Sequence, residues 1–393
     1  MRAVLEESFR TAVAAADPLH ILGAHLPRPP KGRTFVAAAG KAAASMALAV
    51  EQAWPAEAPL EGLAVTRYRH GLPTERIRVV EAGHPVPDEA GESAAKEILY
   101  QVQKLKEEDL LLALLSGGGS SLLSLPAKGV SMAELKTLTG KLLRSGATIQ
   151  EINIVRKHLS AIAGGRLAAA SRAPVLALII SDVTGDDPTH IASGPCAPDP
   201  STIDDTKAVL GKYGIEYAGP FSESPKSSKA RNEVVATAYR SLEAAAEVFR
   251  RQGMRAEILG DRITGEAREV GKEMAQRALA TRGPAVLISG GECTVTIENE
   301  GGRGGRCAEF LLSLGISLQG APNIWGIAAD TDGIDGSEDN AGAVWLPEFA
   351  QRMEARTLLD RHDSYGFFRG AGGLVMTGPT RTNVNDYRAI VIA

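Results

Sequence analysis

The sequence contains no long hydrophobic run. Its longest apolar stretches, Pro174 to Ile180 and Leu110 to Leu115, have the length of a buried strand and fall short of the ~20 residues that a membrane-spanning helix needs. The N-terminal segment carries Glu6, Glu7 and Arg10 among its apolar residues, which is typical of an amphipathic helix and not of a secretion signal. We therefore expect no membrane association and a cytoplasmic protein.

Cysteine and excess charge are also scarce. The three cysteines, Cys196, Cys293 and Cys307, form no CxxC pair, so a disulfide framework or a structural zinc site is not expected and a reducing compartment is the simpler interpretation. A net charge of −4 leaves no electrostatic footprint for nucleic acid or an anionic membrane. An anionic substrate must therefore be held by a few well-placed cations.

Familiar catalytic and nucleotide-binding motifs are missing as well. The sequence GxxxxGK[ST] does not occur, which excludes a P-loop kinase. No GxGxxG follows the first predicted strands, which argues against a standard dinucleotide site. No serine stands in a GxSxG motif, so a hydrolase triad has no support.

What is present is a regular alternation of strand-length apolar runs and helical patterns over 393 residues, which predicts an α/β fold of two domains. We expect strands at residues 34–39, 62–66, 77–81, 110–115, 175–180, 255–259, 285–289, 324–329 and 388–392. Helices are expected at about residues 41–54, 88–105, 132–144, 149–171 and 233–251. The fully apolar run Leu110 to Leu115 indicates the centre of a parallel sheet covered on both faces.

Residues 213–230 have the composition of a linker. The stretch 219–228 is polar, contains two prolines and shows no apolar period. We therefore divide the chain into residues 1–225 and residues 226–393, and expect two α/β/α domains with a cleft between them.

The unusual residues stand at predicted strand ends, where open α/β sheets bind ligands. The loop Ser116-Gly117-Gly118-Gly119-Ser120-Ser121 follows the strand 110–115, and its glycines and serines can turn N–H and hydroxyl donors toward one anion. We interpret it as a phosphate cradle; a tight turn without a ligand is the alternative. Lys41 follows the strand 34–39 and can neutralise phosphate charge, unless it is an ordinary solvated lysine.

Two acidic segments are candidates for metal or acceptor binding. Asp182, Asp186 and Asp187 follow the strand 175–180 and suit Mg²⁺ held partly through water, or a base that orients a hydroxyl. Helix caps and turns account for at least one of them in the alternative interpretation. The turn that contains Asp332 resembles half a calcium loop in composition but lacks the spacing of an EF-hand, and we interpret it as a metal-linked acidic turn.

Four glycines and two arginines alternate in the segment 301–306, which ends in Arg306. Guanidinium groups pair with phosphate or carboxylate bidentately, so this segment predicts a mobile clamp for an anion; a disordered hairpin tip is the alternative. His84 and His158 can each contact a substrate, although such residues are more often structural.

Together these segments resemble the type II glycerate kinases, whose C-terminal part is called the MOFRL domain. The resemblance runs in order through residues 38–42, 81–88, 115–121, 153–160, 164–167, 181–187, 192–195, 304–306, 329–336, 377–380 and 382–386. It covers nearly the whole chain. The sequence differs from the family pattern at Cys307-Ala308, where Asn-Gln is usual, and at Arg381, where glycine is usual.

The resemblance implies a larger N-terminal Rossmann-like parallel sheet, a smaller MOFRL domain, ATP, Mg²⁺ and the conversion of D-glycerate to 2-phosphoglycerate. It places the family's functional lysine and arginine on Lys41 and Arg306. We expect the following roles: catalysis by Lys41, Arg306 and Asp182; phosphate binding by Ser116, Gly117, Gly118, Gly119, Ser120 and Ser121; substrate binding by His84, Lys157 and Ser193; metal binding by Asp182, Asp187 and Asp332.

Two other functions stay open. One is an NAD(P)H-dependent reductase of hydroxypyruvate, a label sometimes given to relatives of this family, against which the missing dinucleotide motif argues. The other is a sugar-acid-binding protein without catalysis. A small-molecule substrate, no nucleic acid, no membrane and a possible homodimer complete the expectations.

Overall fold

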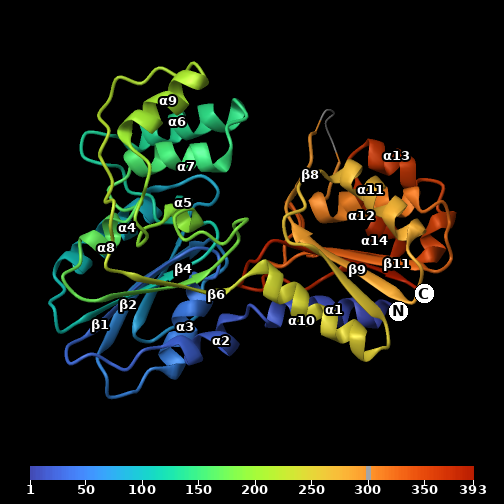
Figure 1. The fold of residues 1–393 in the computed structure, drawn as a ribbon, viewed down its shortest axis with the longest axis horizontal. Coiled ribbons are helices and arrows are strands. Elements are labelled where there is room, and N and C mark those ends of the chain that lie inside the picture. The colour runs from blue at the N-terminus through green and yellow to red at the C-terminus, as the bar shows by residue number, and fades with distance from the viewer. Residues whose placement is uncertain (298–301) are drawn as a thin grey trace. The chain divides into compact units, whose positions relative to one another are not determined.

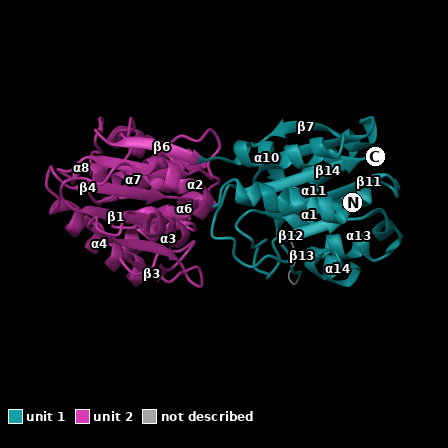
Figure 2. Cartoon of the chain, turned by 90° about the horizontal axis from the view of Figure 1, so that it is seen from below, with its two compact units in different colours: residues 1–17, 236–393 teal, residues 18–235 magenta. Residues whose placement is uncertain are grey.

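The computed structural model describes residues 1–297 and 302–393. The chain forms two compact units, which Figure 2 shows in different colours: unit 2 is Pro18–Val235, and unit 1 is Met1–Asp17 together with Ala236–Ala393. This division differs from the sequence-based boundary at residue 225. Helix α1 (Arg2–Ala14) belongs with the C-terminal residues because its buried face packs on helix α10 (Ala238–Arg251). Its amphipathic pattern indicates a buried face but not the partner that covers it.

Unit 2 is built on a six-stranded sheet with the order β3-β2-β1-β4-β5-β6. Its strands are β1 (Thr34–Ala39), β2 (Leu60–Arg67), β3 (Ile77–Ala82), β4 (Leu110–Leu115), β5 (Val175–Ile180) and β6 (Arg231–Ala236). The pairs β1–β2, β2–β3, β1–β4 and β4–β5 are all parallel. This is the Rossmann strand order, and the sequence of strands changes direction between β1 and β4, where such sheets bind ligands.

Strands β1, β4 and β5 have the bounds that the sequence predicts. All six residues of β1 and of β4 are buried, because helices cover both faces of the sheet, and a continuous apolar run is the only composition that suits such a position. The helix expected at about residues 88–105 is also present, as α4, and Asp88 is its N-cap: the Asp88 carboxylate accepts the N–H of Gly91.

The helices of unit 2 are α2 (Pro18–Ile21), α3 (Ala43–Ala53), α4 (Glu89–Gln103), α5 (Gly119–Leu122), α6 (Met132–Arg144), α7 (Ile149–His158), α8 (Arg166–Ala169) and α9 (Ile203–Lys212), with 3₁₀ turns at Leu22–His25 and Ile191–Ser193. Helices α6, α7 and α9 stand together apart from the sheet (Figure 1). They share a small core of their own that includes Leu138, Leu142 and Ile152.

Two predicted helices are wrong in extent. The expected helix 149–171 ends at His158, because the Ser160 hydroxyl takes the N–H groups of Ile162 and Ala163 and Gly165 has a positive φ of 81°. The expected helix 233–251 begins later, since its first residues form edge strand β6 and Thr237 then caps α10. The first error comes from local hydrogen bonds and the second from pairing in the sheet, and apolar periodicity reports neither.

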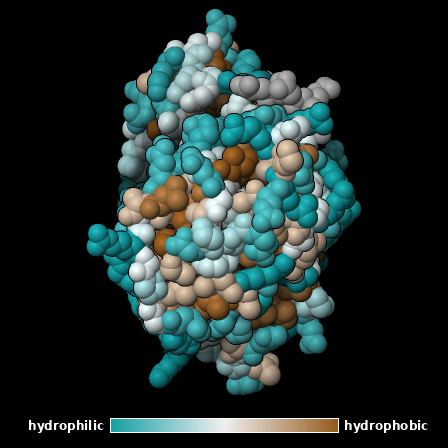
Figure 3. Space-filling view, turned by 90° about the vertical axis from the view of Figure 1, so that its right-hand side faces the viewer, coloured by the Kyte–Doolittle hydropathy of each residue, from teal (hydrophilic) through white to brown (hydrophobic). Residues whose placement is uncertain are grey.

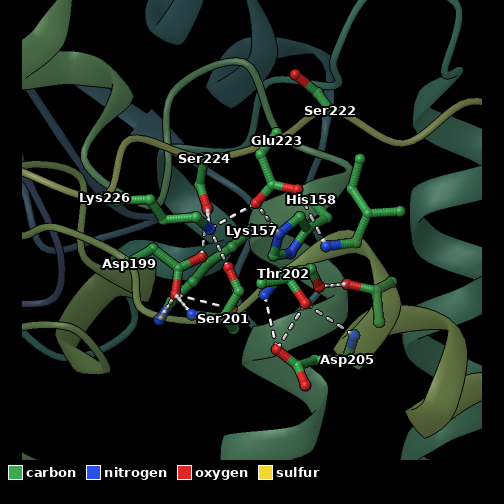
Figure 4. A network of polar contacts seen from close by, with 12 residues as sticks. Lys157, His158, Asp199, Ser201, Thr202, Asp205, Ser222, Glu223, Ser224 and Lys226 are labelled. Carbon is green, nitrogen blue, oxygen red and sulfur yellow. Dashed lines mark hydrogen bonds and ion pairs between the residues drawn. The ribbon is translucent and has the colours of Figure 1, made fainter.

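The segment expected to be a linker packs on unit 2. The N–H of Ser222 donates to the carbonyl of His158, and the Ser224 hydroxyl donates to the Asp199 carboxylate. Figure 4 shows these residues in one polar network that also holds Lys157 and Glu223. The polar, proline-containing stretch 219–228 is therefore a segment that packs across α7 and α9, and we call it the strap.

Unit 1 contains a second six-stranded sheet, of order β13-β12-β11-β14-β9-β7. Its strands are β7 (Arg255–Gly260), β9 (Ala285–Gly291), β11 (Ile324–Asp330), β12 (Gly342–Trp345), β13 (Leu374–Val375) and β14 (Asp386–Ile392), and a small sheet joins β8 (Gly265–Glu266) to β10 (Cys293–Thr294). Further helices are α11 (Ala267–Ala280), α12 (Arg306–Ser317), α13 (Ala355–Asp360) and α14 (Ser364–Ala371), with a 3₁₀ turn at Pro347–Gln351.

This sheet is mixed. Strand β14 lies antiparallel between β9 and β11, so Asp386 at its start stands opposite both Gly291 and Asp330 at their ends. Helices α1 and α10 cover one face and α11 to α14 the other (Figure 1). Both units are thus three-layered, as the sequence predicts. No helix in the described part of the chain is long and apolar enough to cross a membrane.

Candidate functional site

In unit 2, the turn after β1 and the loop after β4 form one hydrogen-bonded structure at the switch point. The N–H of Lys41 donates to the carbonyl of Gly117 over 2.8 Å, and the N–H of Ala42 donates to the Ser116 hydroxyl over 3.0 Å. Gly40 has a φ of 130°, and a Cβ there would come within 2.1 Å of the Ser116 Oγ. Only glycine permits this approach, which brings Lys41 to the loop.

Gly118 is the centre of this arrangement. It has a φ of 81°, and a Cβ on it would lie 2.9 Å from the ring of His84 and 3.4 Å from Cγ of Lys41. Three predicted site residues from separate loops therefore meet. Among the described residues, no acceptor takes the N–H groups of Gly117, Gly118 or Ser120. These donors are available to an anion, as in other backbone anion sites.

Helix α5, which follows the loop, has only four residues. The partial charge of a helix terminus comes from many aligned peptide units, so such a short helix adds little to anion binding. The groups of this region that are suited to an anion are therefore the N–H donors of the loop itself and the neighbouring Lys41.

Ser193, another predicted site residue, is joined to the same loop. Its Oγ lies 2.8 Å from the Oγ of Ser120 and donates to Oδ1 of Asn153 over 3.2 Å. Ala192 and Ser193 both have left-handed backbones, with φ of 52° and 59°, which costs roughly 1–2 kcal/mol for each non-glycine residue. A Cβ on Gly119 would reach 2.5 Å from that of Ala192, so the two loops interlock.

Asp182 and Asp187 follow β5, beside the β4 loop in the order of the sheet. The exposed Asp187 accepts the N–H of Thr189 over 2.8 Å; although partial burial raises its pKa, the hydrogen bonds from Thr189 lower it below the ordinary value. Within residues 1–297 and 302–393, no three His, Cys, Asp or Glu side chains gather as a metal site. The metal role of these aspartates stays a prediction.

Lys157 lies deep within unit 2. Its side chain is 2% exposed, and its ammonium stands 3.3 Å from the buried Asp199, whose carboxylate also takes the hydroxyls of Ser201 and Ser224 (Figure 4). His158 beside it is buried against Glu223. In this arrangement Lys157 faces a carboxylate and not the glycine loop, and substrate contact by Lys157 stays a prediction.

In unit 1, Arg306 is the first residue of α12 and is surrounded by carboxylates. Its Nε donates to Asp386 and its Nη2 to Asp330, both over 2.8 Å, while Nη1 stands 3.0 Å from Glu292. Burial lowers the pKa of this guanidinium, but Asp386, Asp330 and Glu292 together raise it above its ordinary value. Asp386 and Asp330 are buried, whereas the Glu292 side chain is 55% exposed.

The glycine segment before Arg306 is closely packed where the structure describes it; Gly301 of the predicted clamp lies outside the described residues. A Cβ on Gly305 would come within 2.1 Å of the Asp335 carboxylate. That carboxylate caps α12 by accepting the N–H groups of Cys307 and Ala308. Asp332 is also buried and accepts the N–H of Ile334, so it closes a turn.

The sequence did not identify the partners of Arg306. Asp386 lies on β14, Asp330 lies on β11, and Glu292 follows the end of β9. Only the antiparallel insertion of β14 brings the two buried aspartates into register. An aspartate at the start of an apolar strand, such as Asp386, is only a weak indication that a cation lies nearby. The reason for expecting one is that buried carboxylates are almost always paired.

Comparison with known proteins agrees with this geometry. Residues 4–222 match a family described as a domain of unknown function (DUF4147), and residues 285–386 match the MOFRL family. The glycerate 2-kinase of Pyrococcus horikoshii is 40% identical, over 92% of this chain and 87% of that protein. A crystal structure of glycerate kinase from Thermotoga maritima is 37% identical with a TM-score of 0.90, over 100% of this chain and 99% of that one.

The chain belongs to the type II glycerate kinase family. The resemblance seen in the sequence motifs is thus confirmed, together with the fold class and the phosphotransferase class that the family implies. A relative of the kinase family in Agrobacterium vitis, 49% identical over 100% of this chain and 94% of that protein, carries the name "Putative hydroxypyruvate reductase". Members of this one family thus bear two different activity names.

Proposed function

We propose that the protein is a glycerate 2-kinase, which transfers the γ-phosphoryl group of ATP to the 2-hydroxyl of D-glycerate and releases ADP and 2-phosphoglycerate. The observation that carries this proposal is the contact of Lys41 with the glycine loop at the β1–β4 switch point, where N–H donors and a cation face one position. The kinase relatives support the choice of glycerate as acceptor.

Lys41 and the loop suit phosphoryl transfer on physical grounds. The transferred group passes through a loose transition state whose negative charge spreads over three oxygens, so catalysis depends on positioning and charge neutralisation. The N–H groups of Gly117, Gly118 and Ser120 position phosphate oxygens, and the Lys41 ammonium neutralises the charge that develops on them.

Arg306 is the second proposed catalytic cation. Two of its donor edges are fixed by the buried Asp386 and Asp330, while Nη1 faces the half-exposed Glu292. An exposed ion pair contributes little free energy, so an anionic substrate group can replace Glu292 at Nη1 without disturbing the buried pairs. Asp386 and Asp330 thereby orient the guanidinium.

Magnesium fits the residues present, though not as a cage of protein ligands. Mg²⁺ keeps several waters and usually binds phosphate oxygens with one or two carboxylates, and Asp182 and Asp187 are carboxylates at the end of a strand beside the glycine loop. The ion, when bound, neutralises phosphate charge. Asp182 also serves as the proposed acceptor of the substrate hydroxyl proton.

A reductase is the second candidate, favoured by the name of the Agrobacterium vitis relative and by the Rossmann strand order. The turn after β1 is Gly40-Lys41 and has no GxGxxG, while the glycine loop follows β4 instead. A dinucleotide pyrophosphate would therefore have no standard cradle at the first turn.

Two parallel assays test the proposal. Purified protein with ATP, Mg²⁺ and D-glycerate should release ADP, measured by a coupled assay, and should not oxidise NADH or NADPH in the presence of hydroxypyruvate. Nicotinamide oxidation without ADP release would establish the reductase instead. Glycerate binding with neither reaction would leave a non-catalytic binding protein.

We also propose a cytoplasmic location, which three free and buried cysteines support. A homodimer also stays a proposal.

On the face of the molecule drawn in Figure 3, hydrophobic residues appear as small separate areas among hydrophilic ones. Interfaces between permanent partners are usually larger and more apolar, so this face does not support a permanent dimer.

A further inference from the structure

A cavity of about 180 Å³ lies beside the glycine loop, wholly within unit 2. One side of it is the loop and the adjoining Ser193; the other is helix α6, with Leu135 and Leu143. Pro85 and Pro87 complete its apolar wall. A buried water molecule needs roughly 10–15 Å³ of such a cavity. The cavity therefore has room for about a dozen water molecules, or for at least as many covalently bonded non-hydrogen atoms of a ligand.

Arg156 lines this cavity and has an unusual environment. It is a partly buried residue on α7, and among the described residues no carboxylate pairs with its guanidinium and no acceptor takes its side-chain N–H groups. Burial lowers its pKa, and no nearby negative charge offsets that effect. The neighbouring Arg166, by contrast, donates to three backbone carbonyls.

An unpaired guanidinium in a partly desolvated position is unfavourable, and proteins rarely keep one without a partner. A bound anion supplies the missing partner. The rest of the lining agrees with this inference: Lys136 adds a second cation, the other polar side chains are hydroxyls, and no acidic residue lines the cavity. The cavity therefore selects a ligand that combines negative charge with an apolar body.

The two substrates of the proposed reaction differ in this respect. A three-carbon hydroxy acid is small and polar throughout, so it does not fill the cavity and has no apolar group to place against Leu135 and Leu143. A purine nucleotide has a flat ring that suits an apolar wall and phosphates that suit a guanidinium. Ser120 belongs both to the cavity and to the proposed phosphate loop, which joins the two regions.

We propose that this cavity holds the nucleoside of the phosphoryl donor between α6 and the glycine loop, and that Arg156 binds its phosphate chain. The inference rests on the proposed kinase function and extends it, because it assigns the nucleotide to unit 2 and a binding role to Arg156. Arg156 has no role that the sequence predicts, since an arginine before Lys157 on a helix has no distinctive pattern.

Removal of the guanidinium provides the first test. Arg156→Ala and Arg156→Lys are compared with wild type for equilibrium binding of ADP and of adenosine, measured by calorimetry. Loss of a charge-assisted contact should weaken ADP binding by roughly ten- to a hundredfold in Arg156→Ala, and Arg156→Lys should recover part of it. Adenosine, which has no phosphate, should lose far less affinity.

A filled cavity provides the second test. Gly140 lines the cavity on α6, and a Cβ there meets only the end of the flexible Arg144 side chain, at 3.3 Å. Gly140→Leu replaces a poor helix former by a good one, so the variant should fold. It should weaken adenosine and ADP alike. Gly211→Leu is the matched control, since Gly211 is a helical glycine of α9 with no atom within 4 Å of its Cβ position, and it should bind both normally.

Three results would overturn the inference. Unchanged ADP binding in Arg156→Ala and Gly140→Leu excludes the cavity as the nucleotide site. A raised KM for glycerate with unchanged ADP binding assigns Arg156 to the acceptor instead. Equal losses of ADP and adenosine in Arg156→Ala exclude a phosphate contact. Failure of the kinase proposal itself is distinct, because it appears as absent ADP release in the wild-type protein.

Discussion

The imidazole ring of His84 lies so close to Gly118 that a Cβ on Gly118 would come within 2.9 Å of it. His84 follows β3 and Gly118 follows β4, so the contact joins loops from the two sides of the switch point. The glycine is needed for two separate reasons there: its positive φ, and the space that the histidine occupies.

Gly118→Ala should reduce kcat/KM by at least tenfold, because the methyl group displaces His84 and distorts the loop. Gly146→Ala is the control: Gly146 has a similar φ of 74° but no atom within 4 Å of its Cβ position. Both variants should lose about 1 kcal/mol of stability from the left-handed backbone. Equal activity of the two variants would contradict a tightly fitted loop.

Lys41→Ala should lower kcat by roughly 10²–10³-fold, the usual effect of removing one group that stabilises transition-state charge. The KM for glycerate should change far less. Lys128→Ala, at an exposed lysine on the same unit, is the control and should be close to wild type. A steady-state assay in which Lys41→Ala retains near-normal turnover would remove this residue from the mechanism.

Arg306→Ala should lower both turnover and the melting temperature. It removes the cation that the buried Asp386 and Asp330 share, although Asp386 keeps its ion pair with the buried Arg388, so the loss of stability should be at most the ~3–5 kcal/mol typical of a broken buried pair. Glu292→Gln removes only the exposed pair, so its melting temperature should stay within a few degrees of wild type while its KM for glycerate or ATP falls. A rise of both KM values in Glu292→Gln would argue against substrate binding at Nη1.

Asp335 gives a pH dependence with a definite sign. Its burial at the start of α12 raises its pKa from 3.8 to about 7, although the N–H groups of Cys307 and Ala308 oppose that shift. The folded protein then binds more protons than the unfolded chain between these values, so this group favours folding below about pH 4 and the contribution is lost as pH rises through 7.

The comparison of wild type with Asp335→Asn isolates this effect. The melting temperature of wild type relative to the variant should fall as pH rises from 4 to 8, corresponding to roughly 2–4 kcal/mol. A difference that stays constant, or that grows with pH, would contradict a raised pKa for Asp335.

The positions of some strands and of the loops that follow them could be predicted, because the length of a continuous apolar run determines them. Strands β1 and β4 are buried on both faces, so their apolar runs mark the bounds of each strand. The positions of Lys41 and of the Ser116–Ser121 loop follow from those bounds, since polar residues that come directly after a buried parallel strand lie at the carboxyl-terminal end of that strand.

Other features depend on contacts between distant residues. The ionic partners of Arg306 follow from the register of β14, which no local pattern specifies. The burial of Lys157 follows from Asp199 and from the strap that carries Ser224, a segment whose composition indicates a linker. Helix α1 joins unit 1 only because α10 offers an apolar face to it.

The identity of the phosphorylated product tests the central claim most directly. Protein incubated with ATP, Mg²⁺ and D-glycerate should give one new phosphate-monoester signal in the phosphorus NMR spectrum, which coincides with added 2-phosphoglycerate and disappears in Lys41→Ala. A signal that coincides with 3-phosphoglycerate would contradict the proposed acceptor hydroxyl, and the absence of any phosphorylated glycerate would contradict the kinase itself.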